Sequence, residues 1–349
     1  MNIFLILLCI LIPGFVSAAD LQVGDQLPSF EIKEAVTDQD YKYLGLTKGS
    51  FFSKGKIALN DVKGELLLVQ LLNRYCMVCQ KEAPEFNKFF DDADKDARLK
   101  GKVKIIGISI GNSVKEVENF KNEFSAKFPI VADRETEIYR KLGSPRGSPL
   151  VYLARRQGAG WVIVDGFKGE ATANDLKNRS LVALDLDLKQ LKKKPLWTEE
   201  PARRLTEAEM RKLLQERMGT AASITKRIPF PNGDLYVFKK GKETLFAKEE
   251  SRKAICTVCH DVLFVYVFDG KGIVRDFMPV YMTKEWNVPF TSEDIERIRK
   301  SLVGRNMLAP FKFDTQVDSV TSATLTSFLI YDSVHHGKEL LEVIKKEGA

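Results

Sequence analysis

Two Cys-x-x-Cys pairs constrain this chain more than any other feature of its sequence. Four of the five cysteines form the pairs Cys76–Cys79 and Cys256–Cys259, and the fifth, Cys9, lies in an N-terminal apolar run. Structural disulfides usually join distant segments, whereas a Cys-x-x-Cys pair makes a tight, reducible bond and allows one thiolate to attack. The pattern therefore predicts a protein that handles electrons through sulfur.

Residues 1–19 have the pattern of a secretory signal peptide. An uninterrupted apolar run at 3–12 is followed by Pro13, Gly14 and small residues that suit cleavage near Ala19. The run is too short for a comfortable transmembrane span. We therefore expect an exported, periplasmic or otherwise extracytoplasmic protein, in a compartment where disulfides form. No Lys or Arg precedes the run, so a membrane anchor formed by an uncleaved signal is the alternative.

Composition predicts a globular protein of two domains. The chain has 349 residues, 44% of them hydrophobic and 29% charged, which suits two ordinary soluble domains. The formal net charge of +7 is spread along the sequence, and the densest basic run is the three lysines at 192–194. Because three lysines make a small footprint, we expect no nucleic-acid partner.

Residues 20–172 show strand and helix patterns in alternation. The apolar run at 66–72 has the length of a buried strand, and a helical pattern runs from Cys76 to about Ala93. After it we expect a buried strand at 103–110, a helix at 113–126, and a pair of strands at 150–153 and 161–164. This order predicts an α/β domain built on a mixed sheet.

The remainder of the chain predicts a linker and a second domain. Residues 173–204 are polar and rich in Lys, Leu and Asp, and we interpret them as a linker with some helix. A capping box at Thr206 and Glu209 opens a helix at the start of the second domain, 205–349. A strand is expected at 263–268, and helices at 292–302 and 325–346. We therefore predict a smaller α+β domain.

The position of Cys76 predicts its chemistry. It stands where the strand at 66–72 has ended and a helix begins. A helix N-terminus presents N–H groups and partial positive charge, which favour a thiolate. We therefore expect Cys76 to attack and Cys79, one turn further on, to resolve the mixed disulfide.

This segment resembles the redoxin branch of the thioredoxin superfamily, which includes membrane-tethered thiol-disulfide oxidoreductases of the bacterial envelope. The resemblance rests on the motif at 75–84, the entry segment at 23–25 and the Ser148–Pro149 pair. It implies a thioredoxin-like fold, a protein or small-molecule disulfide as substrate, and a cis-proline, Pro149, beside the cysteines. Tyr75 stands where the family usually has Trp. A peroxidase is less favoured, since Asn73 replaces the Thr expected before a single attacking Cys.

The second cysteine pair has more than one interpretation. Cys256, Cys259 and His260 form Cys-x-x-Cys-His, the attachment signature of haem c, with His260 as the iron ligand. The second iron ligand would then be His335, His336 or a methionine, or the iron would have no second protein ligand. The rival interpretation is a second dithiol that exchanges electrons with Cys76 and Cys79. A structural disulfide with an incidental histidine is the third.

The segment 318–327, Asp-Ser-Val-Thr-Ser-Ala-Thr-Leu-Thr-Ser, resembles the flavinylation motif of FMN-binding domains. The resemblance implies that the FMN phosphate is esterified to Thr324. The recognition motif would be Asp318, Thr321, Ser322 and Ala323. A helix N-terminus is a ready anion site, and an ordinary Ser/Thr-rich helix cap is the alternative. The resemblance also predicts that the Cys256–Cys259 pair lies near the flavin.

Together these patterns predict an exported thiol-disulfide oxidoreductase coupled to flavin-mediated electron transfer. FMN on Thr324 would relay electrons through Cys256 and Cys259 between the first site and a membrane or periplasmic electron donor or acceptor. One alternative is a flavin and haem c electron-transfer module whose redoxin domain only docks a partner. The other is a non-enzymatic cytochrome-assembly or binding factor.

Overall fold

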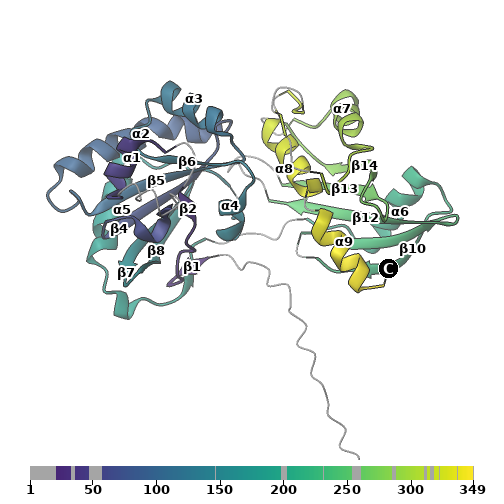
Figure 1. Ribbon diagram of the computed structural model, residues 1–349, viewed down its shortest axis with the longest axis horizontal. Helices are drawn as coiled ribbons and strands as arrows, with labels where there is room; N and C mark the ends of the chain where they lie inside the picture. Colours follow the sequence, from purple (N-terminus) through teal and green to yellow (C-terminus); the bar gives the residue numbers. More distant parts are fainter. Residues whose placement is uncertain are drawn as a thin grey trace, which may run out of the picture.

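The structure is a computed structural model, in which the chain forms two halves (Figure 1). It describes residues 21–32, 36–46, 57–145, 147–197, 203–230, 232–253, 261–284, 288–309, 313–314, 318–321, 323–335 and 337–348. The expected signal segment, 1–19, lies outside the described residues. Among the helices that the structure describes, none has the length and apolar character needed to cross a membrane.

The first half is built on a five-stranded mixed sheet. Its strand order is β6 (Ile130–Asp133), β5 (Val103–Ile110), β4 (Leu66–Leu72), β7 (Leu150–Gln157) and β8 (Gly160–Lys168). Strands β4, β5 and β6 are parallel, whereas β7 runs antiparallel to both of its neighbours, β4 and β8. The strands predicted at 66–72 and 103–110 are confirmed, and the strand pair predicted at 150–153 with 161–164 forms the longer hairpin of β7 and β8.

Helices cover both faces of this sheet. The side chains of α2 (Met77–Lys95), α3 (Val114–Phe124) and α5 (Ala173–Asp185) pack with Leu66 and Leu68 on one face. On the other face, α1 (Asp38–Leu44) and α4 (Glu137–Lys141) share a core with Leu67 and Val69. Successive β4 side chains point to opposite faces, so burial of both faces requires the continuous apolar run seen in the sequence.

Three short strands complete the first half. They are β1 (Gln22–Val23), β2 (Glu31–Ile32) and β3 (Ile57–Ala58), with β2 paired antiparallel to β3. The partner of β1 is β9 (Lys194–Pro195), a strand from the segment that the sequence analysis assigned to a linker.

Residues 173–197 correct the predicted linker boundary, because they belong to the first half. Helix α5 buries Leu176 and Ala183 in the first-half core, and Arg155 donates to the carbonyl oxygens of Ala183 and Leu184 at its end. The Trp197 ring packs at a tilt against the Tyr152 ring, with ring centroids 5.6 Å apart. The polar composition of the segment reflects one exposed helix face, and its few apolar residues form the packed face.

The second half is an antiparallel sheet with helices on both sides. Its strands follow chain order: β10 (Ser223–Ile228), β11 (Leu235–Lys240), β12 (Glu243–Arg252), β13 (Val262–Phe268) and β14 (Val274–Tyr281). Helix α6 (Glu207–Met218) covers one face, and α7 (Ser292–Leu302), α8 (Thr324–His335) and α9 (Gly337–Lys346) share a core with the other. The predicted capping box at Thr206 and Glu209 is present at the start of α6.

The two halves share one apolar core. A single cluster of buried side chains includes Ile110 and Tyr139 from the first half and Phe328 and Tyr331 from α8. In Figure 1, α8 lies on the side of the second half that faces the first. The halves are therefore packed together in this structure through α8.

Candidate functional site

The first cysteine pair lies at the carboxyl edge of the parallel strands. Cys76 is the N-cap of α2, and its sulfur accepts a hydrogen bond from the Cys79 backbone N–H at 3.4 Å. The Cys76 thiol also donates to the Ser148 carbonyl oxygen at 3.3 Å, beside the cis Ser148–Pro149 peptide bond. Both cysteines are 1% exposed. The geometry brings the three residues singled out in the sequence, Cys76, Cys79 and Pro149, into one place.

The loop that carries Cys76 is held by a set of buried amides. The Asn73 side chain donates to the Ile110 carbonyl oxygen at 2.6 Å and accepts from the Tyr75 backbone at 2.8 Å. Asn112 accepts from the Arg74 backbone N–H at 2.8 Å. These bonds tie the loop after β4 to the loop after β5. The start of α2, and with it the Cys76 sulfur, is therefore fixed by the neighbouring strand.

Glu82 is a candidate functional residue that the sequence analysis missed. It lies on α2 three residues after Cys79, so both side chains fall on the same helix face. Burial raises the pKa of Glu82 to about 8, although hydrogen bonds from Gln70 and from the Ala171 backbone oppose the shift. These bonds measure 2.9 and 3.0 Å. A lone Glu in a helix carries no sequence signal of burial, but Gln70 inside an apolar strand was a hint of a polar partner.

Helix α8 of the second half contacts this edge of the first half. The Phe328 ring lies against Gly111, and Leu325 packs on the apolar cluster that contains Cys76 and Cys79. Asp332 accepts from Thr136 of the first half at 3.1 Å and from Arg252 of β12 at 2.8 Å. Leu325, Phe328 and Asp332 are spaced three and four residues apart, so one face of α8 makes these contacts.

The predicted flavinylation segment lies at the start of α8. Thr324 is the first residue of this helix and is partly exposed, Ala323 is buried and Thr321 is exposed. Asp318 lies 3.7 Å from Arg305, and Ser322 lies outside the described residues. A partly exposed hydroxyl at the positive end of a helix fits an attached phosphate, and these residues would hold it. Thr324 therefore stands at the start of a helix, and the attachment of FMN to it stays a prediction.

The second cysteine site cannot be built from the described residues. Cys256, Cys259, His260 and His336 all lie outside them, and so does Cys9. His335 ends α8, and burial lowers its pKa, while nearby Asp332 opposes the shift. Within the described ranges, no three His, Cys, Asp or Glu side chains form a group that could hold a metal ion.

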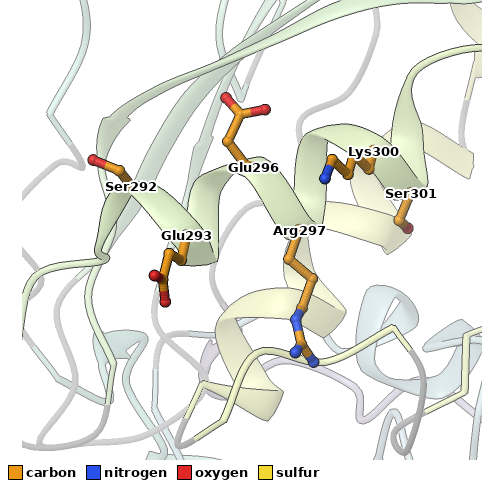
Figure 2. A pocket seen from close by; sticks show the side chains of 6 residues that line it. All are labelled: Ser292, Glu293, Glu296, Arg297, Lys300 and Ser301. Carbon is orange, nitrogen blue, oxygen red and sulfur yellow. The ribbon is translucent and has the colours of Figure 1, made fainter.

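A hollow along α7 is a separate surface feature (Figure 2). Its volume is about 630 Å³, and its six described lining residues all come from one helix, between Ser292 and Ser301. Its acidic residues, Glu293 and Glu296, lie toward the start of the helix, and its basic residues, Arg297 and Lys300, lie toward the end. None of these lining residues belongs to the first half, so the hollow is not part of the cysteine site.

Comparisons with known proteins concern the first half of the chain. Residues 23–159 match the profile of the AhpC/TSA family. Thiol-disulfide oxidoreductase ResA of Bacillus thuringiensis (strain Al Hakam) is 27% identical over 164 residues, which are 47% of this chain and 79% of that protein. ResA of Bacillus subtilis (strain 168) is 27% identical over 125 residues, 35% of this chain and 65% of its own length.

Two solved structures are also similar. A putative Thiol:disulfide interchange protein DsbE from Chlorobium tepidum has 19% identity and a TM-score of 0.35, covering 47% of this chain and 99% of its own. StoA from Bacillus subtilis has 22% identity and a TM-score of 0.32, covering 44% and 97%. The profile match and the strand order identify the first half as a thioredoxin-like redoxin domain. The profile match includes no residue of the second half.

Proposed function

We propose that the first half is the catalytic unit of a thiol-disulfide oxidoreductase. The observation that carries the proposal is the position of Cys76. Its sulfur caps α2, lies one turn from Cys79 and sits beside cis-Pro149. Sulfur at a helix N-terminus, with a second cysteine in reach, suits attack followed by resolution. The ResA relatives named above, which bear that activity in their names, support the same assignment.

The reaction is a two-step exchange. The Cys76 thiolate attacks one sulfur of the substrate disulfide, so the substrate S–S bond breaks and one substrate thiolate leaves. The Cys79 thiolate then attacks Cys76 in the mixed disulfide and releases the second substrate thiolate. Two electrons pass to the substrate, its two thiolates take up protons, and the enzyme is left with a Cys76–Cys79 disulfide.

Glu82 suits the role of proton acceptor for Cys79. Its pKa of about 8 allows it to change protonation near neutral pH, and it lies one helical turn from Cys79. Two hydrogen bonds hold its carboxyl group, from Gln70 and from the Ala171 backbone. In the second step it would take the Cys79 proton as that sulfur attacks.

The test is reduction of insulin disulfides, with dithiothreitol as electron source. Cys76→Ser should reduce the enzyme-dependent rate to background, because no attacking thiolate remains. Cys79→Ser is the matched control and should retain Cys76 reactivity but accumulate a mixed disulfide, visible by mass before and after reduction. Full activity in Cys76→Ser would refute the assignment.

We further propose that FMN is attached to Thr324 and that Cys256 and Cys259 relay electrons between it and the first site. Bound flavin exchanges electrons singly or in pairs, which links thiol chemistry to one-electron carriers. Two contacts support the proposal. Leu325, next to Thr324, packs on the cluster that contains Cys76, and Arg252, which precedes the second pair in sequence, bonds to Asp332 on α8.

The intact denatured mass of protein purified from its native exporting host tests this second proposal. An FMN increment that is lost in Thr324→Val supports it, and Thr326→Val is the control for a neighbouring hydroxyl. A haem increment would favour the flavin and haem c module, with His260 as iron ligand. An unmodified mass would refute both covalent cofactors. A mass without residues 1–19 would support export to the periplasm or another extracytoplasmic compartment.

A further inference from the structure

A hollow of about 640 Å³ lies where the two halves meet. The first half contributes most of its lining, including Arg74, Tyr75, Lys115 and Arg134, and the second half contributes Phe313 and Asp314. We infer that this hollow binds a small disulfide substrate that carries carboxylate groups. The inference rests on the proposed disulfide exchange at Cys76 and adds the class of substrate.

The hollow adjoins the reactive edge of the first half. Arg74 and Tyr75 directly precede Cys76, and the backbone that carries them is fixed through Asn73 and Asn112. Gly111 and Arg134, which also line it, follow β5 and β6 at the carboxyl ends of the parallel strands. A molecule bound there therefore lies at the same sheet edge as the attacking sulfur.

Contacts between the halves hold the walls of the hollow in place. Asp332 of α8 is 3% exposed and is bonded by Thr136, which is fully buried in the first half. Phe328 of α8 lies against Gly111, and the Phe313 ring packs on Phe328 with centroids 5.8 Å apart. The second half therefore supplies a fixed wall to a site whose reactive group belongs to the first.

The size of the hollow and the burial of Cys76 favour a small substrate. Small-molecule sites typically measure about 300–1,000 Å³, a range that includes this hollow. Cys76 is 1% exposed, so the surface of a large folded protein would meet its sulfur poorly. A disulfide of two short peptides has suitable dimensions.

The charges around the hollow favour a substrate with carboxylates. Three cations line it, Arg74, Lys115 and Arg134, against two carboxylates, Glu116 and Asp314. Glu116 already accepts hydrogen bonds from the Tyr75 hydroxyl at 2.5 Å and from the Ser113 backbone at 2.8 Å, as part of the α3 capping box.

The cations themselves differ in how far they are paired. Arg74 pairs with Glu123 at 3.1 Å, and Arg134 lies 3.9 Å from Glu135. Lys115 is exposed, and within the described part of the chain no carboxylate pairs with it. Lys115 is thus the cation best placed to bind a substrate carboxylate.

The experiment compares three disulfides on the full chain: glutathione disulfide, which is small and anionic, cystamine, which is small and cationic, and insulin. We expect the parent protein to have a higher kcat/KM for glutathione disulfide than for cystamine. Lys115→Glu should lower kcat/KM for glutathione disulfide about fivefold, since one exposed charge contact is worth about 1 kcal/mol. The same variant should raise kcat/KM for cystamine.

Two further variants complete the test. Asp314→Asn should raise the ratio of kcat/KM for glutathione disulfide to kcat/KM for cystamine, whereas Lys115→Glu should lower it. Lys189→Glu is the control, because Lys189 is an exposed lysine of the first half that does not line the hollow. A thermal unfolding midpoint equal to that of the parent verifies that each variant is folded.

The outcomes separate the two proposals. One outcome is that the protein exchanges with all three disulfides, but Lys115→Glu and Asp314→Asn leave the ratio of kcat/KM for glutathione disulfide to that for cystamine unchanged. That result would overturn the substrate site and leave the oxidoreductase proposal standing. Reduction of insulin without reduction of glutathione disulfide would do the same. Absence of Cys76-dependent exchange with any disulfide would overturn both.

Discussion

The two halves place their polar chemistry in different ways. In the first half, three parallel strands end at one sheet edge, and the loops there carry Cys76, Gly111 and Arg134. In the second half the strands run antiparallel in chain order, so consecutive connections alternate between opposite ends of the sheet. A parallel arrangement collects reactive loops, whereas an antiparallel meander distributes them. The link between the second half and the cysteine site is therefore α8, which contacts the sheet edge of the first half.

Buried charges show the same difference. Glu82 in the first half is held by a neutral amide and a backbone N–H, and its pKa is raised by burial. Glu249 in the second half is fully buried but pairs with Arg204 at 3.3 Å and accepts from the Leu205 and Asp234 backbones. A buried carboxylate with a cation and several donors is structural, whereas one without a cation is available for proton transfer.

The largest expected effect concerns Asp332, which binds Arg252 within the second half and accepts a hydrogen bond from Thr136 of the first half. Asp332→Ala should lower the free energy of unfolding by about 3–5 kcal/mol, because it leaves the nearly buried Arg252 without this carboxylate. Denaturant unfolding measures the change. Asp185→Ala is the control, since its exposed pair with Arg98 should contribute no more than about 1 kcal/mol. Equal effects of the two substitutions would show that the Asp332–Arg252 pair contributes no more to stability than an exposed pair does.

Glu82→Gln should change how stability depends on pH. The pKa of Glu82 is about 8 in the folded chain against 4.5 for an ordinary Glu, so the folded state retains a proton that the unfolded chain loses. That stability is fully present below pH 4.5 and is lost as pH rises through about 8. Between pH 5 and pH 8, the free energy of unfolding should therefore fall by roughly 3 kcal/mol less in Glu82→Gln than in the parent.

Denaturant unfolding at both pH values checks this second prediction. Glu118→Gln, on an exposed position of α3, is the control and should follow the parent. Parallel curves for the parent and Glu82→Gln would contradict a raised pKa at Glu82.

Gly111→Ala should destabilise the chain by about 2 kcal/mol, from backbone strain at positive φ and from overpacking. Gly111 has φ of +67°, and an added Cβ would lie 2.6 Å from the Phe328 ring. Gly101→Ala is the matched control, because Gly101 has φ of +72° but no neighbour within 4 Å. When Phe328 is also replaced by Ala, Gly111→Ala should cost no more stability than Gly101→Ala. Persistence of an excess cost at Gly111 would mean that α8 does not pack there.

The smallest expected effects compare one capping box in each half. Thr172→Ala at α5 and Thr206→Ala at α6 should each cost about 1 kcal/mol, since each hydroxyl accepts from an N3 backbone N–H. The two thermal unfolding midpoints should fall together if the halves unfold as one unit. Loss of cooperativity in only one variant would show that the halves unfold separately.

The sequence predicted the first half well because its signals are local. The apolar run before Cys76, the helical spacing after it and the turn at 157–160 each appear within a short window, and β4, α2, β7 and β8 follow them. The boundary at 172 was wrong, because α5 has a polar exposed face, and only packing on the sheet identifies it as part of the domain.

The candidate site was predictable only in part. Cys76, Cys79 and Pro149 were found because their motifs are short and specific. Glu82 was missed, because its burial depends on Gln70 and Ala171, which lie 12 and 89 residues away along the chain. The hollow was also missed, because its walls come from segments as distant as Arg74 and Asp314.

The sequence by itself determined the secondary structure around both motifs, since strand runs, helix caps and helix starts depend on neighbouring residues. It placed Cys76 at a helix N-terminus and Thr324 at the start of another. Only the tertiary structure decided that the two helices meet the same edge of one sheet. That arrangement depends on Phe328 against Gly111 and on Asp332 with Thr136, contacts between residues about 200 positions apart, which no local pattern specifies.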